Sequence, residues 1–322
     1  MDTATVPKKK IINEADRSDP VLTICTPAFN RGHLLPRVAE SLRLQTLKTF
    51  EWIVVDDGST DDTQHVLAAL LPGLPFLARC VSLERNGGMH IALNRGLSEA
   101  CGEFFLQLDS DDWLMPNAVE RYLHHWADLN RQGLDREFFG VWSLCVDEGG
   151  AVWGTRFPQN PWKADMWSLI FRHRNMGDKK GVVRTAVWRQ HPFAEEPFLT
   201  SNPWLRMPRS TRMLFINEPL YVYTLPSAVD SITRGVGVKK SRTVRYRNRE
   251  MLNLNWDFFF AFPGKFVYYS NGYNLACDSL GIGLFRRYLD LNPGGALVYT
   301  ASRLVQTVGN IYRMLVKPRG VR

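Results

Sequence analysis

Three carboxylates follow an apolar run in the segment Leu108-Asp109-Ser110-Asp111-Asp112. The run Phe104-Phe105-Leu106 predicts a buried strand, so the carboxylates at its end can converge on one cation. Mg²⁺ and Mn²⁺ prefer oxygen ligands and are commonly held by one or two carboxylates together with water and substrate phosphate. The segment therefore predicts a metal and diphosphate site. The alternative is that Asp112 caps a helix beginning at Pro116.

A second acidic turn, Asp56-Asp57-Gly58-Ser59-Thr60, follows the apolar run 52–55. Gly58 permits a backbone conformation that other residues resist, and Thr60 or Asp61 can cap the next helix. The Asp57 carboxylate, fixed in such a turn, can accept a hydrogen bond from the edge of a base. The alternative is an ordinary turn between a strand and a helix.

Two further loops carry polar groups. The first, Thr26-Pro27-Ala28-Phe29-Asn30-Arg31, offers backbone groups, an amide and a guanidinium, or is a plain loop in which Asn30 caps the next helix. The second, Arg85-Asn86-Gly87-Gly88-Met89-His90, places two glycines, a cation and an imidazole before a helix whose first amides can face an anion. His90 alone is more commonly a structural hydrogen-bonding residue, but the four loops together are more specific than any one.

Alternating strand and helix patterns must position these loops. Strands are predicted over 21–26, 52–55, 76–83 and 103–108, with helices over 34–42, after Thr60 and over 91–100. This alternation predicts an α/β fold with a mostly parallel sheet and helices on its faces. Because ligands bind at the carboxyl ends of the strands in such sheets, three of the loops should meet at one rim.

The second half of the chain lacks this rhythm, which is replaced beyond about Gly149 by Trp- and Pro-rich segments. From about Gly294 to Leu315, apolar residues at helical spacing with flanking cations predict an amphipathic helix. This helix could lie on an anionic membrane or pack against the core, and the pattern favours neither.

Composition limits the class of protein. The chain has 322 residues, 45% hydrophobic and 22% charged, as is typical of a folded soluble protein. Its net charge of +8 predicts an anionic partner: a nucleotide diphosphate, an acidic bilayer or nucleic acid. Five scattered cysteines without a Cys-x-x-Cys pair argue against disulfides and zinc and for a reducing cytoplasm. No segment predicts a signal peptide or a membrane-spanning helix.

The four loops resemble those of the inverting family 2 glycosyltransferases, which have the GT-A fold. The resemblance is strong over about Val21 to Leu114, including Asn94-Arg95-Gly96. It continues more weakly through residues 177–179, 183–185, 192–193 and 215–220, as in bacterial members that build surface polysaccharides. It implies a nucleotide-sugar donor, here a UDP-sugar, with Mn²⁺ or Mg²⁺, and a saccharide or lipid-linked saccharide acceptor.

Carried over residue by residue, the resemblance assigns roles at the rim. Pro27 and Asp57 would contact the nucleotide, with Asp57 reading the base. Asp109 would lie near the ribose and donor sugar, and Asp111, with Asp109, would hold the metal on the diphosphate. The donor-binding residues expected in full are Thr26, Pro27, Phe29, Asn30, Arg31, Asp57, Asn86, Gly88, His90, Asn94, Asp109 and Ser110.

The general base is where the sequence departs from the resemblance. Similar bacterial sequences usually place a glutamate a few residues before a tryptophan, whereas residues 198–203 here hold no acid. The nearest acids are Glu195 and Glu196, in a Pro-flanked loop that cannot readily continue as a helix. We expect Glu196 to be the base, with Glu195 and the more distant Asp178 as alternatives.

The sequence thus predicts a metal-dependent inverting glycosyltransferase of bacterial surface polysaccharide or glycolipid synthesis, in the cytoplasm or on the cytoplasmic face of the inner membrane. The alternative is a catalytically inactive nucleotide-sugar-binding or assembly subunit, given the missing glutamate. No nucleic-acid partner is expected, because the cations form no recognisable binding module, and no oligomeric state is predicted.

The expected domain divisions are a mobile tail over 1–18, a GT-A domain over 19–235 with nucleotide (19–115) and acceptor (116–235) halves, and a helical extension over 236–322.

Overall fold

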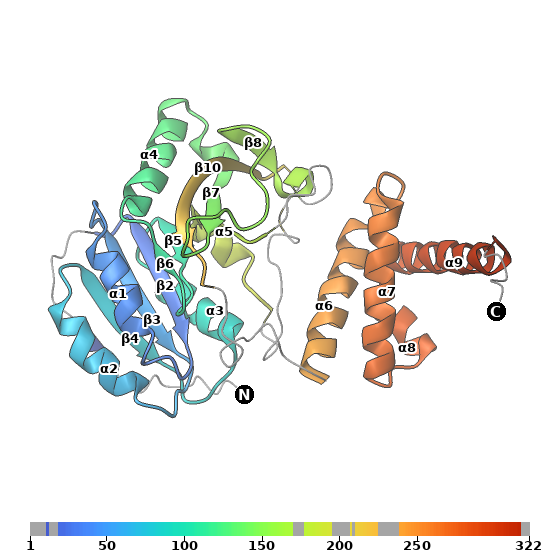
Figure 1. The fold of residues 1–322 in the computed structure, drawn as a ribbon, viewed down its shortest axis with the longest axis horizontal. Helices are drawn as coiled ribbons and strands as arrows, with labels where there is room; N and C mark the ends of the chain where they lie inside the picture. The colour runs from blue at the N-terminus through green and yellow to red at the C-terminus, as the bar shows by residue number, and fades with distance from the viewer. Residues whose placement is uncertain are drawn as a thin grey trace. The chain divides into compact units, whose positions relative to one another are not determined.

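The computed structural model describes residues 11–12, 19–169, 177–194, 207, 210–224 and 238–316 (Figure 1). The chain divides into two compact units. The first consists of residues 1–197 and 207–229, and the second of residues 198–206 and 230–322.

Four parallel strands form the centre of the sheet in the first unit, in the spatial order β4-β3-β2-β5. These strands are β2 (Leu22–Ala28), β3 (Phe50–Asp56), β4 (Leu77–Ser82) and β5 (Phe104–Gln107). Every residue of β2 and β3 is buried, as in strands covered on both faces. The predicted α/β fold with a mostly parallel sheet is confirmed here. β2 runs beyond the expected end at Thr26, because its register with β3 continues to the pair Ala28 and Asp56.

Helices cover both faces of this part of the sheet (Figure 1). The helices are α1 (Leu35–Arg43), α2 (Thr63–Leu70), the short 3-10 helix η1 (Leu71–Gly73), and α3 (Met89–Glu99). Leu35 and Leu42 of α1 and Leu67 of α2 share one core with Trp52. On α3, Gly96 permits close approach to β2, since a Cβ there would lie 2.2 Å from the sulfur of Cys25.

Beyond β5 the sheet becomes mixed, continuing in the order β5-β9-β7-β10-β6. β9 is antiparallel to β5 and β7, whereas β10 is parallel to β7 and antiparallel to β6 and β8. This mixed pairing is the physical reason for the lost strand-helix rhythm. The elements are β6 (Trp113–Leu114), α4 (Ala118–Arg131), η2 (Asp135–Glu137), β7 (Phe138–Val146), β8 (Trp162–Asp165), β9 (Lys179–Arg184), α5 (Thr185–Gln190) and β10 (Arg212–Val222).

At the other edge of the sheet, β1 (Ile11–Ile12) pairs antiparallel with β4. These two residues lie within the segment that was expected to be a mobile tail. The remainder of that segment lies outside the described residues.

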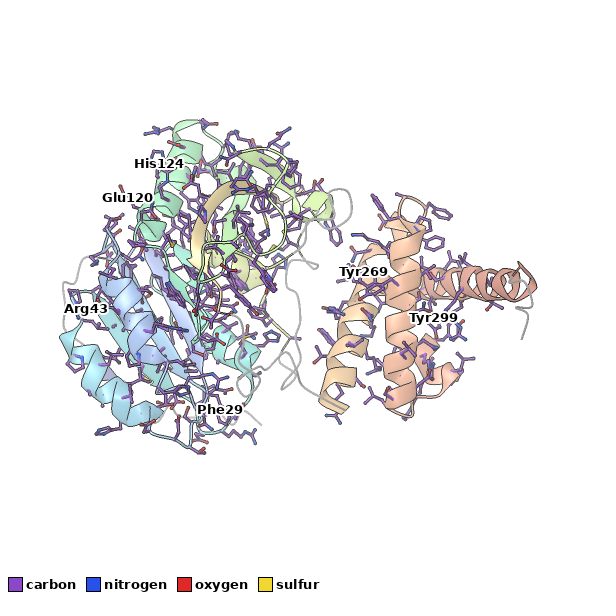
Figure 2. The ribbon with its side chains drawn as sticks, viewed as in Figure 1. Phe29, Arg43, Glu120, His124, Tyr269 and Tyr299 are labelled. Atoms are coloured by element: carbon purple, nitrogen blue, oxygen red, sulfur yellow. The ribbon has the colours of Figure 1, made fainter. Side chains whose placement is uncertain are left out.

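The second unit is helical. Its described elements are α6 (Val238–Asn255), η6 (Trp256–Phe258), α7 (Pro263–Ser279), α8 (Leu284–Leu289) and α9 (Pro293–Val316). Tyr273 of α7 and Tyr299 of α9 are fully buried and pack edge to face, 5.7 Å apart (Tyr299 in Figure 2). α9 matches the helix predicted over 294–315. No helix in the described ranges is both long and apolar enough to cross a membrane.

Candidate active site

The loops after β2 and β3 are tied to each other at the carboxyl ends of the strands. The backbone N–H of Asn30 donates to Oγ of Ser59 at 2.9 Å, and the Asn30 side-chain oxygen accepts from the Thr60 N–H at 2.9 Å. Asn30 has a φ of 54°, which its short polar side chain tolerates better than most. Since Leu34 precedes the first turn of α1, Asn30 does not cap that helix but braces the second loop.

Asp57 connects the second loop to the glycine loop. Its two carboxylate oxygens accept the N–H groups of Gly87 and Gly88 at 2.9 and 2.7 Å. Asp57 is only 2% exposed, and burial raises the pKa of its carboxyl despite these two hydrogen bonds. Gly58 is required here, because it has a φ of 73° and a Cβ would lie 2.7 Å from the backbone of Arg85. A carboxylate has about four acceptor positions, so Asp57 retains capacity for a ligand donor.

The acidic loop after β5 is organised by a lysine from β9. The Lys180 ammonium donates to Oδ2 of Asp109 at 2.7 Å, and the Gln107 amide donates to Oδ1 at 2.6 Å. The Asp109 N–H donates to the hydroxyl of the fully buried Tyr221 at 3.0 Å. Burial alone would raise the pKa of Asp109, but the Lys180 charge and the two hydrogen bonds hold it below its ordinary value. Neither Lys180 nor Tyr221 was predicted from the sequence to belong to the site, although Lys180 adjoins the weakly matching segment 177–179.

Asp112 has a structural position. It is 1% exposed, and its Oδ1 accepts the Thr224 N–H at 2.8 Å, while Oδ2 is buried without a partner in the described part of the chain. Burial and the nearby Asp109 charge raise the pKa of Asp112 to about 8. Asp112 does not cap α4, which begins at Ala118 after Asn117. The alternative role for Asp112 in helix capping is therefore wrong.

Asp111 presents the more accessible carboxylate of the loop. Its main-chain carbonyl accepts hydrogen bonds from Arg37 and from the Thr224 hydroxyl, which fix the backbone. Its half-buried carboxylate receives no hydrogen bond from any other residue in the described ranges. Burial and the Asp109 charge raise the pKa of Asp111, while the cations Arg31 and Lys180 oppose that rise.

The donor set suits a cation shared with a substrate. Within the described residues, no group of three or more His, Cys, Asp and Glu side chains converges as a complete metal site. Mg²⁺ and similar ions need only one or two protein carboxylates when a diphosphate supplies further oxygens. Asp111 fits that role, whereas both oxygens of Asp109 already accept hydrogen bonds.

The remaining residues expected on the first and acidic loops differ in exposure. Thr26 and Pro27 belong to β2 itself, and the buried Thr26 hydroxyl accepts the Trp52 indole N–H at 3.0 Å. Phe29 is 38% exposed just beyond the end of β2 (Figure 2). Ser110 is buried. Thr26 therefore has a packing and hydrogen-bonding role within the sheet, and Phe29 is the accessible side chain.

The residues expected at the donor site on and before α3 contact neighbouring parts of the chain. The Asn86 side-chain oxygen accepts the Gly88 N–H at 3.0 Å. His90 is buried and stacks on Phe193 with ring centroids 4.5 Å apart. The Asn94 amide exchanges two hydrogen bonds with the backbone of Phe193, at 3.1 and 3.0 Å. These contacts attach the chain at Phe193 to the helix that follows the glycine loop.

Of the three expected bases, Glu195 and Glu196 lie outside the described residues. Asp178 is exposed, directly before β9.

Comparison with known families identifies the domain that carries this rim. The model of glycosyl transferase family 2 matches residues 23–140, the stretch that contains all four loops. The chain carries a family 2 glycosyltransferase domain. The family predicted from the loops is confirmed.

Relatives match this domain rather than whole proteins. Chondroitin synthase from Escherichia coli is 37% identical over 138 residues, which are 40% of this chain and 20% of that protein. The GalNAc(5)-diNAcBac-PP-undecaprenol beta-1,3-glucosyltransferase of Campylobacter jejuni is 33% identical over 132 residues, 38% of this chain and 43% of that enzyme. The matches thus span less than half of either relative.

The similarity of the fold to a solved structure covers more of the chain than the sequence matches do. The structure of S. aureus TarS residues 1–349 in complex with UDP-GlcNAc superposes with a TM-score of 0.59. It is 19% identical and covers 89% of this chain and 92% of that chain. The GT-A fold with additional C-terminal helices is confirmed.

Proposed function

We propose that this chain is an inverting glycosyltransferase that moves a sugar from a UDP-sugar to an acceptor hydroxyl. The observation that carries the proposal is the meeting of two carboxylate loops at one sheet rim: Asp57 on the glycine loop, and the acidic loop held by Lys180. These loops follow β3 and β5, the strands on either side of β2, at the carboxyl ends where ligands bind in such sheets. The family 2 domain and the UDP-GlcNAc bound by TarS support this assignment.

In the proposed complex, Asp57 accepts from the base while Pro27, Phe29 and the Asn30 loop line the nucleotide. Asp109, oriented by Lys180, lies beside the ribose and donor sugar. The cations Arg31 and Lys180, whose charges already act on Asp111, would also offset the charge of the diphosphate. Of the other residues expected at the donor site, Asn86 and Asn94 act by holding the backbone of Gly88 and Phe193, and His90 acts by stacking on the Phe193 ring. Ser110 is buried in the acidic loop.

We further propose that Asp111, assisted by Asp109, holds Mn²⁺ or Mg²⁺ on the diphosphate. A bound ion of this kind stabilises the negative charge that develops on a leaving diphosphate. Arg37 and Thr224 fix the backbone of Asp111 before any ligand arrives, so its carboxylate needs little reorganisation.

The acceptor hydroxyl attacks the anomeric carbon in line with the leaving diphosphate, which inverts the configuration, while a carboxylate removes the hydroxyl proton. We propose Glu196 as this base, with Glu195 and Asp178 as alternatives. Support comes from Phe193, which α3 holds by stacking and two hydrogen bonds. Glu196 follows Phe193 by three residues in the sequence.

The acceptor is proposed to be a saccharide or lipid-linked saccharide in bacterial surface polysaccharide or glycolipid synthesis, at the cytoplasmic side of the inner membrane. By its name, one relative synthesises chondroitin, and the other transfers glucose to an undecaprenol-linked saccharide. If the chain bound UDP but neither hydrolysed a UDP-sugar nor transferred its sugar, it would instead be the catalytically inactive nucleotide-sugar-binding or assembly subunit.

The metal role is tested with Asp111→Asn, which removes the charge but preserves the side-chain shape. We expect the Mn²⁺-dependent affinity for UDP to fall at least about tenfold and transfer to fall more than about a hundredfold. Titration calorimetry with UDP, with and without Mn²⁺, measures the first effect. Asp62→Asn, an exposed carboxylate near the rim, makes the same charge change and should alter neither. Unchanged Mn²⁺-dependent affinity in Asp111→Asn would exclude this assignment.

A further inference from the structure

The positive charge of the chain is concentrated in its C-terminal part. Residues 238–322 hold fourteen Lys and Arg against four Asp and Glu, whereas the rest of the chain holds 26 Lys and Arg against 28 Asp and Glu. Only this C-terminal part therefore carries a net positive charge. Arg242 and Arg247 on α6 and Arg286 on α8 are exposed. A cationic surface of this kind attracts an anionic partner.

The same unit exposes apolar side chains on α8 and α9. Phe285 is 78% and Leu289 69% exposed, and their spacing of four residues places them on one face of α8. On α9, Leu297 and Leu304 are each 62% exposed and Val305 is 53% exposed, at a spacing of seven and eight residues. This stripe is separate from the packed side of α9, where Val298, Tyr299 and Ser302 are buried. We call these exposed residues, with Leu284, the α8–α9 apolar face.

A direct contact brings the two helices of this face together. The Tyr288 hydroxyl of α8 hydrogen bonds with the Thr300 hydroxyl of α9 at 3.1 Å. Tyr288 lies three residues from Phe285, and Thr300 lies between Leu297 and Leu304 at helical spacing. This contact brings α8 and α9 together near their exposed apolar side chains, and the exposed Arg286 follows Phe285 in the sequence.

We propose that the α8–α9 apolar face docks on an anionic lipid bilayer, lying on the surface without crossing it. Interfacial helices combine buried Phe and Leu side chains with cations that pair with acidic headgroups, and this unit has both. A second copy of the chain is a poorer occupant, because two units with the same large excess of cations repel each other. This surface shares no residue with the proposed catalytic rim, and its test does not use transfer activity.

Flotation of the full chain with lipid vesicles tests the proposal. We expect binding to vesicles of phosphatidylcholine with about one third phosphatidylglycerol, weakened by high salt, and little binding to phosphatidylcholine alone. Phe285→Asp with Leu304→Asp should weaken binding at least about tenfold, since each change removes apolar burial and adds a like charge to the lipid. Both residues are exposed, so thermal unfolding should change little.

The matched control is Leu44→Asp, an exposed leucine of the first unit, which should bind vesicles as the original chain does. Equal binding by the double variant and the control, or no preference for anionic vesicles, would overturn the proposal. Sedimentation velocity adds a second criterion. A dimer that the double variant dissociates would assign the face to a second copy of the chain and would also overturn the lipid assignment.

Discussion

Three carboxylates within four residues of one loop occupy three different environments. Asp109 is paired with Lys180, Asp111 is half-buried with an open carboxylate, and Asp112 is buried with one oxygen lacking a partner among the described residues. The pKa of Asp109 is lowered, whereas those of Asp111 and Asp112 are raised, to about 8 for Asp112. Environment, more than residue type, therefore separates the carboxylate that is proposed to hold a cation from the two that hold the loop.

The general base is the residue-scale prediction. If Glu196 removes the acceptor proton, Glu196→Gln should lower the transfer rate by roughly 10²–10⁴-fold while UDP affinity stays the same, because the base acts only in the transition state. Steady-state transfer assays and UDP titration measure the two quantities. Glu195→Gln and Asp178→Asn serve as matched controls, and each should retain most of the activity. A large loss in one of these controls, with normal turnover in Glu196→Gln, would move the role to that residue.

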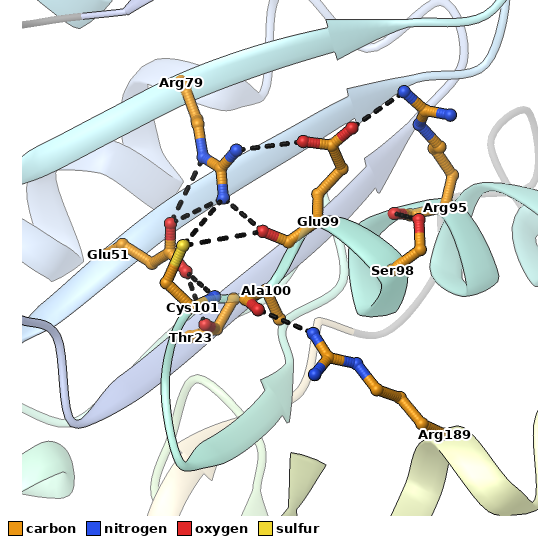
Figure 3. Close-up of polar contacts among 9 residues, drawn as sticks. All are labelled: Thr23, Glu51, Arg79, Arg95, Ser98, Glu99, Ala100, Cys101 and Arg189. Carbon is orange, nitrogen blue, oxygen red and sulfur yellow. Dashed lines mark hydrogen bonds and ion pairs between the residues drawn. The ribbon is translucent and has the colours of Figure 1, made fainter. Parts of the chain in front are cut away.

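At the scale of elements, α3 is fixed at both ends. Its first turn follows Gly88, whose N–H is held by Asp57. At its other end, a charged network joins Glu99, the last residue of α3, and Cys101 to the sheet through Arg79 and Glu51 (Figure 3). The helix therefore connects the ligand rim to a buried anchor at the opposite ends of the strands.

Glu51→Gln should lower the free energy of unfolding by about 3 kcal/mol. The side-chain oxygen of the substituted glutamine would still accept the Cys101 N–H. The substitution would, however, remove the fully buried negative charge that pairs with Arg79 at 2.9 Å. Denaturant unfolding measures the change. Glu40→Gln removes an exposed pair with Arg43 and should cost less than about 1 kcal/mol. Similar small losses in both variants would show that the network contributes little stability.

The elements of the first half were predictable because their signals are local. A β-branched run such as 52–55 and a glycine turn such as Gly58 specify strand and loop within a few residues. The contacts that complete the site are not local: Lys180 reaches Asp109 from 71 residues away, and Thr224 reaches Asp112 from 112 residues away. These partners depend on the order of β9 and β10 in the mixed sheet, which no sequence period encodes.

At the scale of the whole molecule, the two units have separate cores. The first centres on the sheet and includes Trp52 and Tyr122, and the second centres on Phe266, Tyr273 and Tyr299. All the proposed donor-binding residues belong to the first unit. Ligand binding and C-terminal packing should therefore affect different unfolding transitions.

Tyr299→Ala tests this separation. Tyr299 is fully buried, packs on Tyr273 and donates to the Asn274 side-chain oxygen at 2.9 Å, so its loss should destabilise the helical unit by about 3–5 kcal/mol. UDP at a hundred times its Kd should stabilise the other unit by about 2.7 kcal/mol, equally in the original chain and in Tyr299→Ala. Scanning calorimetry should resolve two transitions, one moved by the substitution and one by UDP.

Tyr268→Ala, at a tyrosine that is 67% exposed on α7, is the control and should move neither transition. A single transition that both the substitution and UDP shift would mean that the units unfold together, and the separation of roles would then be wrong.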